Sequence, residues 1–451
     1  MITDIRIPGD VKMILGRLQE HDHKAYVVGG CVRDSLMGVE PHDWDICTSA
    51  TPDQVKKAFP RTHLVDTGLK HGTVTVVVNH APYEITTFRV DGDYSDYRHP
   101  DSVAFTDDLR QDLSRRDFTI NAMAYSEEEG LIDPFNGQHD LCCGFIRCVG
   151  KPDERFREDP LRILRAMRFE SRLGFYPDIH TEMSMDDNCG LLKNVSAERI
   201  QSELCKMLAG VYIKRTLMNH AFVICEIIPE MSACRFFDQR NRWHQYDVYE
   251  HIVRAVDAYR GGDLTVRLAL LFHDIGKPSC FFVNASGGHF YGHPEISARI
   301  TNEIMTRLKF DNKTRHDVVE LVKEHDRTFS PTAKAARKLL NQMGETQARR
   351  LLEIRRADII GQRDDISQDR LDELNNFAMM INDVVNNHDC FSLKDLAVNG
   401  NDLKKLGFQG KEIGHELQYL LDLVISGVLP NNKEEILFKS EGRRYEKEIP
   451  G

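Results

Sequence analysis

The stretch AYVVGGCVRDSLMGVEPHDWDICTSATP, residues 25–52, decides the fold of the amino-terminal part of the chain. A short apolar run, Ala25–Val28, breaks at the glycine pair Gly29–Gly30 and continues into a helix-like segment. Glycine lets backbone N–H groups approach a phosphate closely. Asp43 and Asp45 follow, and the two-residue period of a β-strand predicts that they share one face of a strand. Two carboxylates on one face suit a pair of Mg²⁺ ions that bridge to substrate phosphates.

Each half of this stretch also has a simpler interpretation. A glycine pair is typical of a tight turn, and an Asp-x-Asp sequence is typical of a solvated surface. The two in this order are more specific than either alone. GGCVRD followed by DWDI resembles the signature of the nucleotidyltransferase superfamily that includes DNA polymerase β. Within it, the chain resembles the class II tRNA nucleotidyltransferase (CCA-adding enzyme) and bacterial poly(A) polymerase family.

The composition indicates a soluble protein of several domains. The chain has 451 residues, of which 41% are hydrophobic and 29% charged, which are ordinary values for globular proteins. Its apolar runs are shorter than the ~20 residues of a membrane span, and MITDIRIPGD lacks the pattern of a signal peptide. The 11 cysteines are scattered without a C-x-x-C pair, which predicts reduced thiols and a cytoplasmic location. A formal charge of −11 argues against a general nucleic-acid coat protein, although arginines cluster between Arg147 and Arg172.

Two further segments of this region carry candidate residues. Glu84 lies in a β-rich run, Pro82–Arg89, and is our candidate for a third carboxylate near the metals; a solvent-facing glutamate is an equally good interpretation. A helix is predicted to begin within Leu113–Ala124. There RRDFTINAM matches the family's second motif, and the match implies that Arg116 contacts the nucleoside triphosphate. The resemblance also assigns triphosphate binding to residues of the opening stretch: Gly29, Gly30 and Arg33.

The polar segment Asp91–Asp101, DGDYSDYRHPD, predicts an irregular loop. A plain surface excursion would have the same composition. In the family, a flexible loop at this place lets the enzyme add the terminal A, and enzymes that add only CC lack it. The segment therefore resembles the full CCA-adding type.

A helix that admits Pro160 in its first turn is predicted over Phe156–Leu173. Charged residues recur at every third position, which by itself is typical of a solvated stripe of ion pairs: Asp159, Arg162, Arg165 and Arg168. EDPLR, residues 158–162, also matches the family's EDxxR motif, and the match implies that this stripe binds the nucleotide.

The chemistry of the bases explains why a carboxylate and a guanidinium suit this role. Asp159 can accept from the amino group of cytosine or adenine, and Arg162 can donate to the adjacent ring nitrogen. Guanine and uracil would leave these groups unpaired, at roughly 1–3 kcal/mol each in a buried pocket. The resemblance places Arg165 and Arg168 at further nucleotide-contacting positions.

After Trp243 the sequence pattern changes to apolar helical segments with His and Asp residues near their ends. LTVRLALLFHDIGKP, residues 264–278, is an apolar helical pattern that ends in a His-Asp pair. A lone buried histidine is more often a core residue than a ligand. With the His and Asp residues around it, however, this pair resembles the HD phosphohydrolase domain. The resemblance implies four metal ligands, with His293 and His325 as secondary candidates: His251, His273, Asp274 and Asp358.

Imidazole and carboxylate groups together bind a divalent metal and can activate water against a phosphoester. HD folds also persist as scaffolds after losing turnover, so hydrolase activity stays open.

These resemblances imply an α+β fold with a polymerase-β-like α/β head at residues 1–150 and an all-α neck at residues 151–235. An HD body at residues 236–365 and a helical tRNA-binding tail at residues 366–451 follow. The implied activity is template-independent addition of C, C and A to the 3′ end of tRNA from CTP and ATP, with Mg²⁺ and a second divalent metal in the HD body.

Three alternatives stay open. The first is a poly(A) polymerase with the same head, the second an HD phosphohydrolase with an inactive head, and the third an RNA-binding protein without catalysis. The oligomeric state is also open, and no membrane association is expected.

Overall fold

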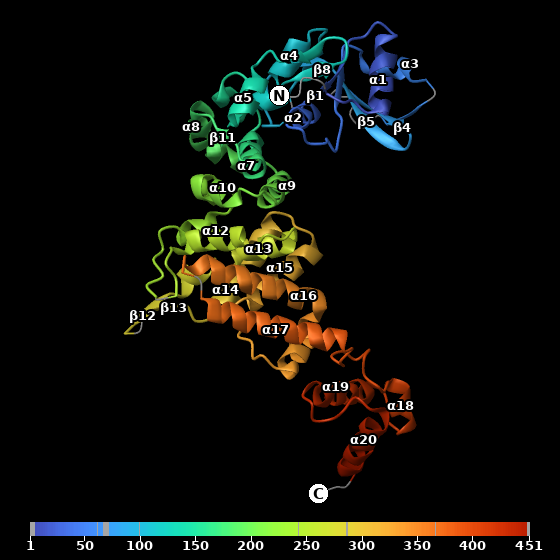
Figure 1. The fold of residues 1–451 in the computed structure, drawn as a ribbon, viewed down its shortest axis with the longest axis vertical. Coiled ribbons are helices and arrows are strands. Elements are labelled where there is room, and N and C mark those ends of the chain that lie inside the picture. The colour runs from blue at the N-terminus through green and yellow to red at the C-terminus, as the bar shows by residue number, and fades with distance from the viewer. Residues whose placement is uncertain are drawn as a thin grey trace. The chain divides into compact units, whose positions relative to one another are not determined.

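The computed structural model describes residues 5–60, 62–65, 72–98, 100–241, 243–285, 287–365 and 367–448. The chain forms two compact units, Met1–Pro229 and Glu230–Gly451. Figure 1 shows a sheet with surrounding helices in the first unit and a largely helical second unit. None of the helices in the described ranges is long and apolar enough to cross a membrane. The sheet and helices of the first unit, together with the helices of the second, confirm the predicted α+β fold class. His99, in the predicted loop, lies outside the described residues.

The first unit contains strands of two to seven residues. They are β1 (Ala25–Val28), β2 (Ile46–Thr48), β3 (His63–Val65), β4 (Thr73–Val78), β5 (Ala81–Thr87), β6 (Arg89–Asp91), β7 (Val103–Phe105), β8 (Ala124–Ser126), β9 (Gly130–Ile132), β10 (Phe145–Ile146) and β11 (Tyr176–Pro177).

The helices of this unit surround the sheet and continue beyond it. They are α1 (Gly9–Gln19), α2 (Gly30–Leu36), α3 (Pro52–Ala58), α4 (Leu109–Ser114), η2 (Thr119–Asn121), α5 (Gly137–Cys143), α6 (Pro152–Glu158), α7 (Leu161–Leu173), α8 (Ile179–Asn188), η3 (Cys189–Asn194), α9 (Ala197–Leu208), α10 (Ile213–Asn219) and α11 (Ala221–Ile227). A 3₁₀ helix, η4 (Pro229–Cys234), follows.

Among the described residues, seven strands form one mixed sheet in the order β3-β4-β5-β2-β1-β8-β9. β2 runs parallel to β5, with Ile46 beside Ile85, and antiparallel to β1. All four residues of β1 are apolar and buried, as expected for a strand at the centre of a covered sheet. The N–H of Val28 donates to the carbonyl of Asp45 over 3.0 Å. The sheet therefore holds the end of β1 beside the start of β2.

The predicted neck helix is two helices. α6 ends at Glu158, and α7 begins at Leu161 with Pro160 as its N-cap residue. Asp159 between them is extended, with φ −143° and ψ 96°. Proline disfavours helical backbone at the preceding residue, so the helix predicted across Phe156–Leu173 is interrupted at Asp159. The helix predicted to begin within Leu113–Ala124 is also wrong, because α4 ends at Ser114.

Among its described residues, the second unit has one pair of short antiparallel strands and is otherwise helical or irregular. Its elements are α12 (Val248–Ala258), α13 (Leu264–Phe272), η5 (Lys277–Cys280), β12 (Phe282–Asn284), β13 (Gly287–His289), α14 (His293–Arg307), α15 (Asn312–Glu324), α16 (Ala333–Gln362), α17 (Gln368–Asn386), α18 (Gly400–Lys405), α19 (Lys411–Ile425) and α20 (Lys433–Glu448).

α16 contacts both the helices that precede it in this unit and the helices that follow it. Its carboxyl-terminal half packs against α12 and α13. In its amino-terminal half, Arg337 donates to the carbonyl of Ile425 in α19 over 3.1 Å and pairs with Asp389 at 2.8 Å. Gly344 lies between the halves with φ 74° and ψ 167°. The last helices enclose an apolar core of their own that includes Leu403 and Leu420.

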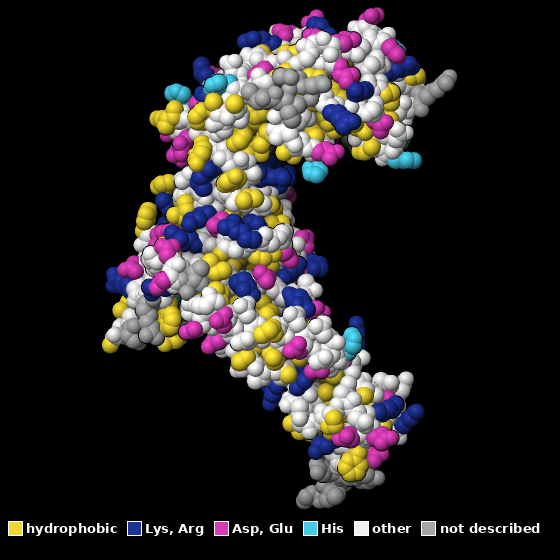
Figure 2. Space-filling view, viewed as in Figure 1, with side chains coloured by type: hydrophobic (Ala, Val, Ile, Leu, Met, Phe, Trp, Pro, Cys, Tyr) yellow, Lys and Arg dark blue, Asp and Glu magenta, His cyan; other side chains and the backbone are white. Residues whose placement is uncertain are grey.

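Charged side chains of both signs are interspersed on the visible face of each unit (Figure 2). All 11 cysteines lie in the described ranges, and no disulfide joins any two of them there. The reduced state of the thiols stays a prediction.

Candidate functional site

A cavity of about 550 Å³ opens in the first unit where β1, β2 and α7 meet. Most of the predicted nucleotide-binding residues line this cavity. They are Gly29, Gly30, Arg33, Asp43, Asp45, Arg116, Arg165 and Arg168. Segments up to 177 positions apart in the sequence, from Gly29 to Lys206, thus contribute to one concave site.

Asp43 and Asp45 line the same cavity, but the predicted strand position is wrong. β2 begins only at Ile46, because β1 ends at Val28, where the chain turns at Gly29. Asp45 keeps one ladder hydrogen bond through its carbonyl. Although Asp45 is an exposed residue, desolvation by the surrounding protein raises the pKa of its carboxyl group; the charge of Arg116 opposes this shift, and the charge of Asp43 adds to it. A pair of carboxylates open to solvent offers oxygen ligands to a cation.

Gly29 brings the backbone against three polar groups. Its φ is 82° and its ψ −127°, a conformation that glycine adopts readily. A Cβ atom there would lie 2.9 Å from Nη1 of Arg116, 3.8 Å from the carbonyl oxygen of Asn121 and 4.0 Å from Oδ2 of Asp45. The absence of a side chain at Gly29 therefore allows Arg116 to lie beside the start of α2.

Three guanidinium groups surround the ring of Phe169. The Cζ atoms of Arg33, Arg165 and Arg168 lie 5.1, 5.9 and 4.6 Å from its centroid, within the range of cation–π attraction. Burial and then Arg165 lower the pKa of Arg168 to about 10. Sequence reasoning did not select Phe169, although it is the aromatic residue next to Arg168 in the neck motif.

Asp117 and Asn121 hold two of these arginines in place. Nη2 of Arg165 donates to Asp117 over 2.5 Å, and Nη1 of Arg33 donates to Oδ1 of Asn121 over 2.6 Å. Burial works to raise the pKa of Asp117, but Arg165 outweighs it and the pKa lies below its usual range. Both residues belong to the quoted RRDFTINAM motif, so the motif itself was the signal that could have identified them.

Asp159 and Arg162 lie outside this cavity lining. Asp159 accepts from Arg199 over 2.7 Å. Arg162 is buried; it donates to Glu158 over 2.6 Å and to the carbonyl of Arg115 over 3.0 Å. Three helical residues turn through about 300°, so the side chain direction shifts by about 60° at each step of the predicted stripe. The stripe therefore divides, and only its carboxyl-terminal part faces the cavity.

Glu84 is exposed on β5, beside Thr75 of β4, and does not line this cavity either. The parallel register that pairs Ile46 with Ile85 would, if continued by one residue, set Glu84 beside Asp45. The prediction of a third carboxylate at the metals stays a prediction.

In the second unit, the four predicted HD ligands converge and are buried. Nε2 of His251 lies 3.0 Å from Oδ2 of Asp274 and 3.2 Å from Oδ1 of Asp358. Nε2 of His273 lies 3.3 Å from the same oxygen of Asp274. Burial by itself lowers the pKa of His273, but the carboxylates outweigh it and raise the pKa to about 10. The surrounding charge is therefore negative and suits a cation.

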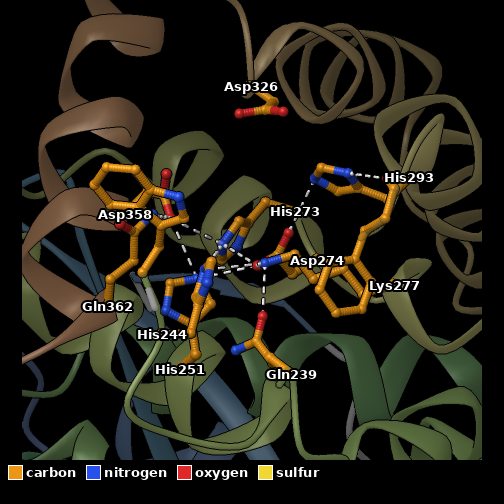
Figure 3. A network of polar contacts seen from close by, with 12 residues as sticks. Gln239, His244, His251, His273, Asp274, Lys277, His293, Asp326, Asp358 and Gln362 are labelled. Atoms are coloured by element: carbon orange, nitrogen blue, oxygen red, sulfur yellow. Dashed lines mark hydrogen bonds and ion pairs between the residues drawn. The ribbon is translucent and has the colours of Figure 1, made fainter. Parts of the chain in front are cut away.

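Lys277 and His244 complete the wall of this cluster (Figure 3). Nζ of Lys277 lies 2.6 Å from Oδ2 of Asp274, donates to Gln239 over 3.0 Å and lies 3.2 Å from Nε2 of His244. Burial and then Lys277 lower the pKa of His244 to about 2, so this imidazole is neutral and accepts from the ammonium group. Lys277 lies three positions after Asp274 in HDIGKP, a spacing that could have drawn attention to it.

Three models of known families match parts of the chain. Residues 25–147 match the poly(A) polymerase head domain, and residues 174–233 match the "Probable RNA and SrmB- binding site of polymerase A". Residues 294–439 match tRNA nucleotidyltransferase domain 2. Most residues that line the cavity of the first unit lie within the match to the poly(A) polymerase head domain.

Comparisons with whole proteins identify the family. The chain is 50% identical over 204 residues to a CCA-adding enzyme of Geobacillus thermodenitrificans, a match that covers 45% of this chain and 50% of the relative. This sequence match thus spans about half the length of that curated relative. The solved Bacillus stearothermophilus CCA-adding enzyme in complex with CTP is 30% identical, with a TM-score of 0.72, over 97% of this chain and 98% of that one. A Thermotoga maritima CCA-adding enzyme complexed with tRNA shares the fold at 21% identity and a TM-score of 0.61, with 97% of each chain covered. The chain belongs to the family of CCA-adding enzymes.

Proposed function

We propose that the protein adds C, C and A to the 3′ end of tRNA, with CTP and ATP as substrates. The observation that carries this proposal is the cavity in which the Asp43–Asp45 carboxylates face the arginines of α7. It combines groups suited to a cation with groups suited to a triphosphate. The relatives named as CCA-adding enzymes support the same activity.

Asp43 and Asp45 would hold a pair of catalytic divalent metal ions, which we take to be Mg²⁺. Oxygen ligands and a solvated position suit these ions. When bound, one would lower the pKa of the primer hydroxyl and the other would neutralise charge on the triphosphate. The position of both carboxylates on the wall of one cavity supports this assignment.

The arginines would position the triphosphate. Arg33 and Arg165 are held by Asn121 and Asp117, so their guanidinium groups are already oriented before a ligand arrives. Pre-oriented donors lower the entropic cost of binding. Arg116 lies beside Gly29, where a phosphate at the start of α2 would meet both the backbone N–H groups and a positive charge.

Asp159 and Arg162 would select the base after releasing their present partners. In the structure they are bonded to Arg199 and Glu158. When the nucleotide binds, Asp159 and Arg162 would exchange these internal partners for the edge of the base. Tyr94 of the predicted loop lies near these groups: burial and then Asp91 raise its pKa, whereas Arg162 opposes the shift. This proximity supports a role for the loop when the required base changes from C to A.

One assay tests the proposed activity. Purified protein and Mg²⁺ are incubated with tRNA that lacks its 3′ CCA, and CTP and ATP are supplied singly and together. CTP alone should add two residues, and both nucleotides should add three and then stop. Growth of a homopolymer from ATP alone would instead indicate a poly(A) polymerase. Asp43→Ala should abolish incorporation, whereas the exposed Asp53→Ala on α3 should not; retained transfer by Asp43→Ala would refute the assignment.

For the second unit, we propose that His251, His273, Asp274 and Asp358 hold a divalent metal. Their donor atoms all lie within 4.8 Å of one another, and mixed imidazole and carboxylate donors suit a transition metal. A phosphohydrolase activity at this centre is the second candidate function, favoured by the cavity of about 640 Å³ that reaches Asp274 and Asp358.

A further inference from the structure

Asp112 of α4 is a buried carboxylate whose two oxygens face different arginines. Oδ1 accepts from Nε and Nη2 of Arg115 over 3.0 and 2.8 Å, and from the backbone N–H of Arg89 over 3.3 Å. Oδ2 lies 3.7 Å from Nη2 of Arg116. The Asp112 side chain is buried and does not line the cavity of the first unit, whereas Arg116 does. Asp112 therefore meets Arg116 from the protein interior.

The contact between Asp112 and Arg116 is an ion pair without a hydrogen bond. Oδ2 of Asp112 and Nε of Arg116 are both buried without a hydrogen-bond partner among the described residues. Buried polar groups are usually hydrogen-bonded, so this arrangement is unusual for a purely structural pair. Arg115 takes the hydrogen bonds of Oδ1 and also lies 3.9 Å from Oδ2 of Asp91. Arg116 thus receives a compensating charge while its guanidinium group stays directed toward the cavity.

A second carboxylate lies on the cavity side of Arg116. A Cβ atom at Gly29 would lie 2.9 Å from Nη1 of Arg116 and 4.0 Å from Oδ2 of Asp45, so both charged groups border the same glycine. Desolvation raises the pKa of Asp45, and the positive charge of Arg116 works against this shift, as expected for neighbouring opposite charges. Arg116 therefore lies between an interior carboxylate and one of the proposed metal ligands.

An arginine beside a carboxylate that binds a metal can compete with the metal for it. If Arg116 paired with Asp45, its guanidinium group would occupy oxygen atoms that a divalent cation needs. Removing one partner of a buried ion pair leaves an uncompensated charge, which is strongly unfavourable. Without the charge of Asp112, Arg116 would therefore turn toward another carboxylate, and Asp45 is beside it.

We infer that Asp112 is a positioning residue for nucleotide addition, which holds Arg116 away from Asp45 and so leaves Asp45 available to a metal ion. Arg115 supports this role, because it occupies Oδ1 and prevents Arg116 from folding back onto Asp112. The role rests on the metal position proposed above at Asp43 and Asp45. It adds a residue that lies outside the cavity lining and acts through Arg116.

Binding of Mn²⁺ tests this role without relying on activity. Metal-free protein is titrated with Mn²⁺ in the absence of nucleotide, and the free ion is measured by its electron paramagnetic resonance signal. Because the second unit also offers a metal position, the binding that Asp43→Ala removes defines the site of the head. Asp112→Asn should weaken this binding about tenfold, as a new ion pair near the protein surface would. The double variant Asp112→Asn/Arg116→Met should restore it, because the competing guanidinium group is gone.

Asp178→Asn is the matched control for the loss of a buried carboxylate. Asp178 is buried and pairs with Arg147 at 2.8 Å, and neither residue lines the cavity. In urea titrations Asp178→Asn should lose unfolding free energy, as Asp112→Asn does, but it should keep the wild-type affinity for Mn²⁺. A purely structural role of Asp112 predicts equal Mn²⁺ affinities of the two variants, and that result would overturn the positioning role.

Arg115→Ala should have a different effect from Asp112→Asn. Once Oδ1 of Asp112 is free, Arg116 should donate to it and withdraw from Gly29. The KM for CTP in tRNA extension should then rise by about tenfold or more, the effect of losing a hydrogen bond to a charged group. Binding of Mn²⁺ by the head should stay unchanged. An unchanged KM, or a weaker affinity for Mn²⁺, would contradict the part assigned to Arg115 and overturn the positioning role.

The possible outcomes separate this role from the proposed function. Mn²⁺ binding that Asp43→Ala removes and Asp112→Asn leaves unchanged would overturn the positioning role and leave the metal position intact. Binding that Asp43→Ala does not affect would overturn both. A double variant as weak as Asp112→Asn would show that Arg116 is not the competing group and would also overturn the role. If Asp112→Asn does not fold, as judged by circular dichroism, Arg115→Ala decides.

Discussion

Replacing Gly29 with alanine tests whether the close approach of Arg116 to the backbone matters for nucleotide addition. The positive φ of Gly29 would cost an L-residue on the order of 1–3 kcal/mol. The added Cβ would lie 2.9 Å from Nη1 of Arg116. Because this atom ends a flexible side chain, we expect the guanidinium group to move and the backbone to stay. The unfolding free energy should therefore change by little more than the backbone term.

Gly130→Ala is the matched control, because Gly130 has φ 71° and an added Cβ there meets no described atom within 4 Å. Both variants should lose about 1–3 kcal/mol of unfolding free energy in urea titrations. Only Gly29→Ala should displace Arg116 and weaken its hydrogen bond to a phosphate. A hydrogen bond to a charged group contributes roughly 1.5–3 kcal/mol, which corresponds to about 10- to 160-fold in kcat/KM.

The assay measures CTP incorporation into tRNA that lacks its 3′ CCA over a range of CTP concentrations. In a double-mutant cycle, Gly29→Ala should add little to the loss caused by Arg116→Ala, since both act through the same guanidinium group. If kcat/KM of Gly29→Ala stays within twofold of the Gly130→Ala value, this reasoning is refuted.

Three further variants test the support around the cavity. Asp117→Asn should lower the unfolding free energy at pH 7 by about 3 kcal/mol, because it leaves partly buried Arg165 without its carboxylate; urea titration measures this. The folded-state pKa of Asp117 is depressed, so the wild type should keep this contribution to the unfolding free energy above pH ~4 and lose it as the pH falls further. The unfolding free energy of the variant should change less with pH in that range. Parallel pH profiles of the two proteins would contradict the assignment. Phe169→Leu should raise KM for CTP and ATP alike by several-fold, because each cation–π contact contributes about 0.5–2 kcal/mol; an effect on only one nucleotide would argue against a shared triphosphate site. Arg199→Ala should lower the KM for CTP and ATP, because Asp159 no longer has to release this partner before it accepts from the base; an unchanged KM would show that this bond is not involved.

Local chemistry made part of the fold predictable. The break at Gly29–Gly30 follows from backbone preferences that act within a few residues. The His-Asp pair at the end of α13 was visible because an apolar helix stops at a charged residue. These features need no knowledge of distant contacts.

Other features depend on partners that are distant in the sequence. Asp43 and Asp45 left the predicted strand because the neighbouring strand β1 ends at Val28. Arg162 turned from the cavity toward the carbonyl of Arg115, 47 positions away. His293 and His325 meet only through the packing of α14 on α15. Periodicity along one segment could not reveal such pairings.

The backbone break at Gly344 divides α16 into two stretches with different contacts. The stretch after it supplies Asp358 to the buried histidines, and the stretch before it anchors the terminal helices through Arg337. If α16 were continuous and rigid, a displacement of the terminal helices would also displace Asp358. With φ 74° at Gly344, a load taken up at one end can be absorbed as a local rotation. The terminal helices can then shift while Asp358 keeps its distance to His251.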